Sequence, residues 1–177
     1  MQSEIRNKIK KLRAQLSQEI VKNKSKKIAD NLFAIPFLFE KQNYFIYKSF
    51  KNEVDTDKII KRLTDLNKTI AYPITINDYM VAGVPKDNEF ILDKFGVSTP
   101  KNYTILNEVE VAFIPLVACD KNKNRIGFGK GYYDKFLKDK NCIKVGICYD
   151  FQVVDFIEPN PTDIPLDIIV TESGIIW

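Results

Sequence analysis

Histidine is absent from this sequence of 177 residues. Without imidazole, any mechanism that uses a histidine base or a histidine metal ligand is excluded. The three cysteines form no C-x-x-C pair, so neither a disulfide framework nor a zinc site is expected. No apolar run reaches the length of a membrane span, and the basic, amphipathic first segment has no secretory apolar core. We therefore expect a protein of the reducing cytoplasm without a membrane partner.

Acidic residues are scarce at the start of the chain, and basic residues are missing near its end. Residues 1–27 hold nine Lys or Arg against two acids, whereas residues 150–177 hold six acids and no Lys or Arg. We expect most of the basic side chains on a solvated helix face, although a few can point toward a phosphate. A nucleic-acid arm would interleave aromatic side chains with the charge, and residues 1–32 contain none, so no nucleic-acid partner is expected.

Alternating helical and extended patterns predict one α/β domain over residues 1–177. Ser17 is placed to end one helix and cap the next. We expect a Rossmann-like, three-layer arrangement, in which helices flank a mainly parallel open sheet. The helical apolar spacing begins with Ile5, Ile9, Leu12, Leu16 and Ile20. The strand patterns lie within 43–50, 69–74, 111–118, 143–149 and 168–171.

The segment after the first strand carries candidate ligand groups. Residues 48–52 leave this strand as a loop, and Glu53 follows just before a helix that Thr56 is placed to cap. A loop at the carboxyl end of a strand is where open α/β sheets place ligand groups. An ordinary surface glutamate is the commoner interpretation of Glu53, and its location makes it a candidate ligand group as well.

The region between the second and third strand patterns is less regular. Pro73 is expected to end the second strand. Residues 77–107 lack clear periodicity and carry several turn signals, which favours a hairpin or an irregular excursion. Tyr79, Met80 and Phe90 are candidates for lining a pocket there, although core packing is the commoner role for each.

The most specific stretch is glycine-rich and runs from Arg125 to Asp134. It follows a buried strand pattern and precedes helical spacing, so its backbone can approach a ligand beside free helical N–H groups. Lys130 and Arg125 supply the positive charge that phosphate needs, and Asp134 in the first helical turn can hold magnesium that shares phosphate oxygens. Its spacing fits neither a Walker A loop nor a dinucleotide fingerprint. We interpret it as another kind of phosphate loop; the plain alternative is a flexible surface turn.

Residues 111–120 followed by 125–134 resemble the signature of the 5-formyltetrahydrofolate cyclo-ligases, also called methenyltetrahydrofolate synthetases. Weaker similarity covers nearly the whole chain, at Ile5-Arg6, Arg13, Leu16-Ser17, 53–56, Tyr72-Pro73 and 163–167. The resemblance implies an ATP- and magnesium-dependent enzyme that converts 5-formyltetrahydrofolate to 5,10-methenyltetrahydrofolate and releases ADP and phosphate. It also implies that the formyl oxygen attacks the γ-phosphate, giving an N5-iminophosphate before N10 closes the ring. Chemistry of this kind relies on positioning and charge neutralisation, so it needs no histidine.

The resemblance further implies roles for individual residues. The expected catalytic residues are Lys130, Arg125 and Tyr132, and the expected magnesium carboxylates are Asp134 and Asp167. ATP would lie along Arg6, Arg125, Ile126, Gly127, Phe128, Gly129, Lys130, Gly131, Tyr132 and Tyr133. The folate would contact Lys48, Glu53, Phe128, Gly129, Lys130, Gly131 and Tyr132.

This chain departs from the family pattern at two of the positions concerned. Relatives often carry a lysine where this chain has Gln2, so either Lys8 or Lys10 compensates or the nucleotide contact is weaker there. Relatives can also carry an apolar residue at the position of Lys48.

Two other classes of protein remain as alternatives. A sugar-phosphate isomerase of similar topology would use a carboxylate base without nucleotide or magnesium. A binding module would dock its basic first helix on RNA or an acidic partner, with steeply salt-dependent binding. The cyclo-ligase is the main prediction, with ATP and the folate as small-molecule partners of a monomer.

Overall fold

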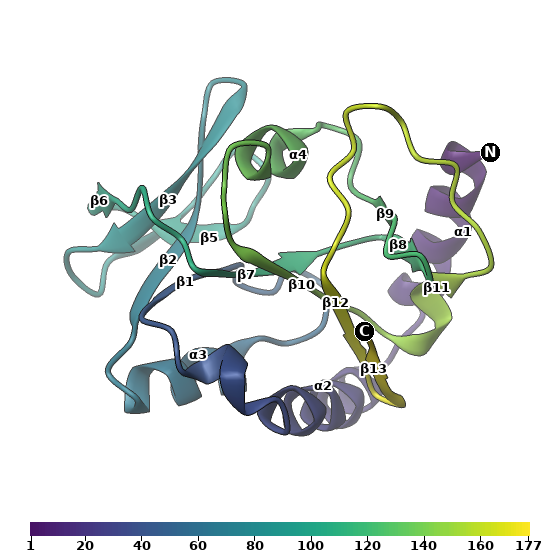
Figure 1. Cartoon of the computed structure of the whole chain (residues 1–177), viewed down its shortest axis with the longest axis horizontal. Coiled ribbons are helices and arrows are strands. Elements are labelled where there is room, and N and C mark those ends of the chain that lie inside the picture. Colours follow the sequence, from purple (N-terminus) through teal and green to yellow (C-terminus); the bar gives the residue numbers. More distant parts are fainter.

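Eight strands form one mixed sheet (Figure 1) in the computed structural model, which describes all residues, 1–177. The strands are β1 Asn43–Ile46, β2 Thr69–Ile76, β3 Tyr79–Pro85, β6 Tyr103–Ile105, β7 Val111–Pro115, β10 Ile143–Ile147, β12 Ile168–Thr171 and β13 Gly174–Ile176. Their order is β13-β12-β10-β7-β1-β2-β3-β6. The five from β12 to β2 are parallel, whereas β13, β3 and β6 add antiparallel pairs toward the edges. The predicted mainly parallel sheet is confirmed.

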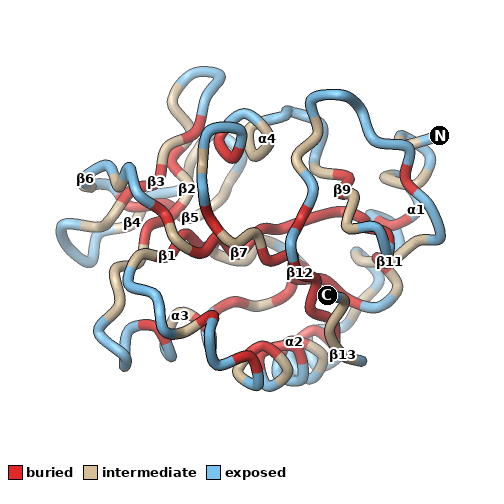
Figure 2. The backbone as a smooth tube through the Cα atoms, in the orientation of Figure 1, coloured by how far each residue is buried: buried red, intermediate tan, exposed pale blue.

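Side chains alternate between the two faces of this sheet, and each face is covered. Tyr44 and Ile46 belong to the core cluster that packs under two helices, α2 Gln18–Phe33 and α3 Asp57–Asp65. Phe45, between them, points to the opposite cluster, which contains Phe136 of α4 Tyr132–Leu137. Figure 2 shows the resulting buried stretches along the central strands. The expected three-layer α/β arrangement is therefore confirmed.

A smaller unit lies beside the large sheet. It consists of β8 Ala118–Asp120, β9 Arg125–Ile126 and β11 Val153–Val154, and helix α1 Gln2–Ala14 packs on it through Ile9. The remaining elements are the hairpin of β4 Phe90–Leu92 and β5 Ser98–Pro100 and two 3-10 helices, η1 Pro36–Phe39 and η2 Asp150–Gln152. None of the helices is long and apolar enough to cross a membrane.

The predicted strand 111–118 is in fact two strands in different sheets. β7 ends at Pro115, which cannot donate to a ladder, and β8 begins at Ala118. The carbonyl groups of Leu116 and Val117 instead accept hydrogen bonds from the side-chain amide of Gln152. Every residue of 111–118 is buried, so the apolar pattern gives no sign of the break.

Pro73 does not end the second strand, because β2 continues to Ile76. Pro73 pairs with Ala82 of β3, while its carbonyl accepts from the Thr99 hydroxyl at 3.0 Å. The pairing of β2 with β1 stops at Ala71, so the missing N–H of Pro73 leaves no ladder bond unmade. Of the two possibilities for 77–107, a hairpin is present as β4–β5.

The helices α2 and α3 begin where the sequence predicts, but only one of the two expected N-caps forms. Ser17 does cap α2, since its Oγ accepts from the N–H of Ile20. Thr56 precedes α3 without capping it, because its hydroxyl donates to the carbonyl of Tyr47. Leu12 and Ile20 are exposed, because the chain turns between α1 and α2 and their apolar stripe is interrupted.

Candidate active site

A cavity of about 760 Å³ lies at the carboxyl ends of the parallel strands. Tyr47 follows β1, Pro115 ends β7, and both line it. Helix α1 and the hairpin β4–β5 supply further walls. The cavity brings together every sequence-predicted site residue except Asp167: Arg6, Lys48, Glu53 and the whole stretch from Arg125 to Asp134.

The glycine-rich stretch forms a loop between β9 and α4. Gly129 and Gly131 have φ angles of +98° and +69°, which other residues rarely adopt. Gly131 is the N-cap of α4, and Asp134 lies in the first turn, as predicted. The Nε of Arg6 donates to the carbonyl of Gly127 at 3.0 Å, so α1 holds the loop from the side.

Positive charge converges on this loop from α1 and from the loop after β1. Arg6, Lys10 and Arg13 of α1 line the cavity together with Lys51. Burial lowers the pKa of Lys10, and the charges of Arg6, Arg13 and Lys51 lower it further. Like charges gathered in this way favour a polyanionic ligand.

The aromatic side chain of the glycine loop lies among the same cations. The Phe128 ring has the ammonium of Lys10 at 5.8 Å and the guanidinium of Arg13 at 5.6 Å from its centre. Cations at this range are attracted to the face of an aromatic ring. Phe128 therefore adds a second link between α1 and the loop.

Arg125 and Asp134, which begin and end the stretch, form an ion pair. Their Nη2 and Oδ1 atoms are 2.7 Å apart, and the Arg125 side chain is only 3% exposed. Oδ1 of Asp134 also accepts from the N–H of Ile164 at 3.1 Å. The buried Nε of Arg125 has no hydrogen-bond partner. Arg125 is thus a fixed charge beneath the loop, whereas Lys130 is exposed in the cavity.

Glu53 is a buried carboxylic acid rather than an ordinary surface glutamate. It is 9% exposed, and one of its oxygens accepts from the N–H of Phe50 at 2.8 Å. Burial raises the pKa of Glu53 to about 7, against the opposing effects of the Phe50 hydrogen bond and the Arg13 charge. A carboxyl group in this state is suited to paired hydrogen bonds with a planar ligand.

Lys48 lines the cavity, but its ammonium lies over aromatic rings. It is 4.3 Å from the centre of the Phe90 ring and 5.9 Å from that of Tyr72. Phe90 itself packs edge-on against Tyr72 and does not line the cavity. Of the three residues in 77–107 expected to line a pocket, only Met80 lines this cavity. Tyr79 is exposed to solvent.

Asp167 does not line this cavity, so the cavity does not bring together the two carboxylates expected to hold magnesium, Asp134 and Asp167. It directly precedes β12, and its carboxylate accepts from the N–H of Lys144 at 2.7 Å. The Lys144 ammonium is also 3.0 Å from it. Both residues lie where β10 and β12 begin, at the amino ends of the parallel strands, whereas the cavity is at the carboxyl ends.

Sequence reasoning missed several residues that line the cavity. Lys51 and Asn52 lie in the loop after the first strand, and Asp163 begins the similarity at 163–167, but neither pattern gave any of the three a role of its own. The position of Gln2 is also clear. Its side chain donates to the carbonyl of Glu158, and Lys10 rather than Lys8 shares the cavity with it.

The fold and cavity define a class, single-domain α/β proteins in which a glycine-rich loop and several cations share a cavity with a buried carboxyl group. Comparison with known proteins narrows this class. A sequence profile of the 5-formyltetrahydrofolate cyclo-ligase family matches residues 1–172. The chain therefore belongs to the 5-formyltetrahydrofolate cyclo-ligase family, whose members are ligases of folate one-carbon metabolism.

Individual relatives agree with this assignment over their full length. The 5-formyltetrahydrofolate cyclo-ligase of Haemophilus influenzae is 31% identical, over 94% of this chain and 96% of the relative. The 5-formyltetrahydrofolate cyclo-ligase of Mycoplasma genitalium is 33% identical, over 93% and 96%. The resemblance found in the sequence is confirmed.

Solved structures show the same fold. The 5,10-methenyltetrahydrofolate synthetase of Aquifex aeolicus superposes with a TM-score of 0.87 at 30% identity, covering 98% of this chain and 91% of that one. The synthetase of Mycoplasma pneumoniae gives 0.77 at 29% identity, covering 97% and 98%.

Proposed function

We propose that this protein catalyses the ATP- and magnesium-dependent closure of 5-formyltetrahydrofolate to 5,10-methenyltetrahydrofolate, with release of ADP and phosphate. The observation that carries this proposal is one cavity in which the loop of Lys130 lies between the cations of α1 and the buried Glu53. A triphosphate and a folate can meet there. All of these groups come from one chain, so a monomer would be sufficient to form the site.

The triphosphate would occupy the side of the cavity formed by α1 and the glycine loop. Arg6, Lys10 and Lys130 would neutralise its charge, and Arg125 would add a fixed charge beneath it. The backbone of residues 126–133 would approach the phosphates closely because Gly127, Gly129 and Gly131 carry no side chains.

The folate would occupy the opposite side. Glu53 in its ionised form would accept hydrogen bonds from the amide and amino groups of the pterin, and Lys48 and residues 128–132 would border the ring. Binding donors to the carboxylate lowers its pKa, which offsets the effect of burial. Glu53 thereby distinguishes a pterin from ligands that lack this pair of donors.

The reaction needs positioning more than acid–base catalysis. A formamide oxygen is a poor leaving group, and its attack on the γ-phosphate of ATP forms a P–O bond while the bond to ADP breaks. N10 then attacks the same formyl carbon, the ring closes, and phosphate leaves with the former formyl oxygen. Lys130 would neutralise the transferred phosphoryl group. The Tyr132 hydroxyl, now 3.4 Å from the Asn77 carbonyl, would reorient to the reacting oxygen.

The carboxylates of the cavity fit a magnesium ion that arrives with ATP. No group of three acidic, cysteine or histidine side chains is arranged to hold a metal ion. Asp134 uses Oδ1 for Arg125 and Ile164, which leaves Oδ2 for the ion. Magnesium commonly takes one or two carboxylates, substrate phosphates and water, and it would supply charge neutralisation at the phosphates.

The test is a direct assay of product. Purified protein is mixed with 5-formyltetrahydrofolate, ATP and magnesium, and the near-ultraviolet absorbance of the methenyl product is followed. We expect turnover that stops when either ATP or magnesium is left out. Lys130→Ala should lower kcat/KM for ATP by about 10²-fold, the scale found when one transition-state contact is removed.

Lys135→Ala is the matched control for the loop. Lys135 lies five residues further on and is exposed, and it does not line the cavity, so its loss should leave the kinetics unchanged. Absence of product with folded wild-type protein would overturn the proposed reaction. Equal kinetics for the two lysine variants would instead remove Lys130 from the mechanism.

A further inference from the structure

The side chain of Asn52 joins two walls of the cavity. Its Nδ2 donates at 2.9 Å both to the Arg13 carbonyl, in the last turn of α1, and to the Leu16 carbonyl just beyond it. Its Oδ1 accepts from the side chain of Gln18 at 3.0 Å. The Arg13 carbonyl also accepts from the N–H of Leu16 at 3.2 Å, so the Asn52 amide is a further donor at the C-terminal end of α1. We call this set of three hydrogen bonds the clasp.

On the other side of the clasp, Asn52 belongs to a closed turn that carries Glu53. The N–H of Phe50 donates to the Glu53 carboxylate, and the N–H of Glu53 donates to the Phe50 carbonyl at 3.2 Å. Lys51 within the turn has φ +52°, an unusual conformation for a lysine. Because Glu53 directly follows Asn52 in this closed turn, the position of the Glu53 carboxylate depends on that of Asn52.

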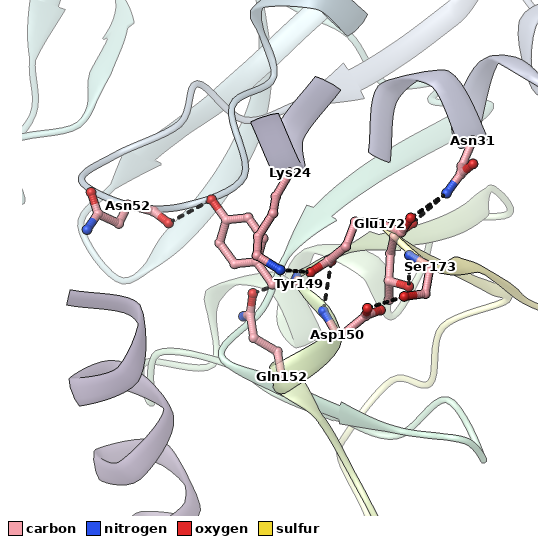
Figure 3. Close-up of polar contacts among 9 residues, drawn as sticks. Lys24, Asn31, Asn52, Tyr149, Asp150, Gln152, Glu172 and Ser173 are labelled. Atoms are coloured by element: carbon pink, nitrogen blue, oxygen red, sulfur yellow. Dashed lines mark hydrogen bonds and ion pairs between the residues drawn. The ribbon is translucent and has the colours of Figure 1, made fainter. Parts of the chain in front are cut away.

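The turn is also anchored from behind. The Tyr149 hydroxyl donates to the Asn52 carbonyl at 3.1 Å, and Figure 3 shows this contact. Tyr149 is fully buried, and its N–H donates to the Gln152 side chain. With its rear fixed to the core, the turn is joined by the clasp to Arg13 in the last turn of α1 and to Leu16 and Gln18 just beyond that helix.

Through the clasp, the two proposed ligand walls are held at a set separation. The α1 wall carries Arg6 and Arg13, and Arg6 in turn holds the glycine loop at Gly127. The turn carries Glu53. We propose that Asn52 is a positioning residue that fixes the distance between the nucleotide wall and the folate wall. This inference rests on the proposed function, since it assumes that the two substrates lie on these walls.

The consequence concerns the reaction rate rather than substrate binding. Each substrate binds mainly to its own wall, but the formyl oxygen and the γ-phosphate must approach across the space between the walls. A misplacement of about 1 Å between reacting groups can cost roughly 10²-fold in rate. Loss of the clasp should therefore lower kcat while leaving each KM nearly unchanged.

Asn52→Asp is the sharpest variant. Aspartate keeps the size of the side chain but has no N–H to donate, and its charge faces two carbonyl oxygens. We expect kcat to fall by about 10²-fold and both KM values to change by less than about threefold. Asn52→Ala, which leaves the carbonyls open to water, should show the same split with a smaller loss of kcat and covers the case in which the aspartate variant does not fold.

Asn31→Asp is the matched control. Asn31 also bridges two carbonyls through Nδ2, those of Thr171 and Glu172 at 2.8 and 3.3 Å. None of these three residues lines the cavity, and Figure 3 shows Asn31 in the cluster around Glu172. Because the chemical change is the same, thermal unfolding midpoints of the two variants report the shared structural cost. Asn31→Asp should keep the wild-type kcat.

The outcomes separate the possibilities. A fall in kcat confined to the Asn52 variants supports the clasp. A rise in KM at constant kcat would make Asn52 a binding residue and overturn the proposal, as would equal kcat in Asn52→Asp and Asn31→Asp. Absence of turnover in the wild-type protein would remove the proposed function and this inference together, whereas wild-type turnover with unaffected Asn52 variants removes the inference alone.

Discussion

At the scale of single residues, Glu53 carries the clearest physical signature in the molecule. Its raised pKa means that the folded protein holds a proton which the unfolded chain releases at lower pH. Between the ordinary glutamate pKa and about 7, the native state therefore binds more protons than the unfolded state. Stability contributed by protonated Glu53 is complete below that window and is lost as pH rises through it.

The substitution Glu53→Gln removes this titrating group, so the pH dependence of the unfolding free energy should differ between the wild type and the variant. From pH 5 to pH 8 the unfolding free energy of the wild type should fall relative to Glu53→Gln by about 3 kcal/mol, since one pKa unit corresponds to about 1.4 kcal/mol. Urea unfolding at several pH values measures it, and all other titrating groups cancel in the difference. Parallel pH profiles for the two proteins would show that Glu53 is not perturbed.

Residue identities in the glycine stretch could be predicted from the sequence, but their pairing could not. The motif indicated Arg125 as a phosphate cation and Asp134 as a metal ligand. The structure shows that the two contact each other at 2.7 Å. Residues nine positions apart meet only because the loop turns back at Gly129 and Gly131, whose positive φ angles cannot be predicted from charge or hydropathy. For a related reason the sequence could not show that Asp167 lies outside the cavity, because a motif does not tell at which end of the strands its residues lie.

At the scale of elements, the buried side chain of Gln152 replaces a strand contact. It accepts from the Tyr149 N–H at 2.9 Å and donates to the Leu116 and Val117 carbonyls at 2.9 and 3.0 Å. These two carbonyls lie at the bend between β7 and β8, so η2 fixes the point at which the chain leaves the large sheet for the smaller one. The glycine loop follows directly from that smaller sheet.

Gln152→Leu tests this connection. Leucine has nearly the same volume but leaves the N–H of Tyr149 and two buried carbonyls without partners, so we expect a loss of about 3 kcal/mol in unfolding free energy. The exposed Gln18 offers the comparison, because Gln18→Leu removes one solvent-exposed hydrogen bond and should cost less than about 0.5 kcal/mol. Similar losses for both variants in urea unfolding would contradict a special role for Gln152.

The elements that could be predicted are those whose apolar pattern is long or continuous. The central parallel strands are in this group because their buried runs are continuous, and α2 is in it because its buried residues recur at helical spacing. β8, β9 and β11 have two or three residues each, too few for any period to appear. Their pairing depends on side-chain contacts such as those of Gln152, which no local pattern records.

At the scale of the whole molecule, the uneven charge along the sequence becomes an uneven charge in space. Seven cationic side chains and four acidic ones line the cavity, and three of the cations, Arg6, Lys10 and Arg13, come from α1. The sequence could show that residues 1–27 are basic, but only the packing of Ile9 against the smaller sheet decides which face of α1 meets the cavity. Lys8, two positions before Lys10, does not line it.

This arrangement predicts that the KM for ATP depends on salt concentration through the cations on one face of α1. Raising ionic strength from 0.1 to 1 M shortens the screening length from about 10 to about 3 Å, and the KM for ATP should rise on the order of tenfold. Lys10→Gln should raise KM at low salt and flatten its increase, whereas Lys8→Gln, the same charge change on the same helix, should behave as wild type. If both variants flattened the increase equally, the net charge of the whole molecule rather than its placement in the cavity would attract the nucleotide.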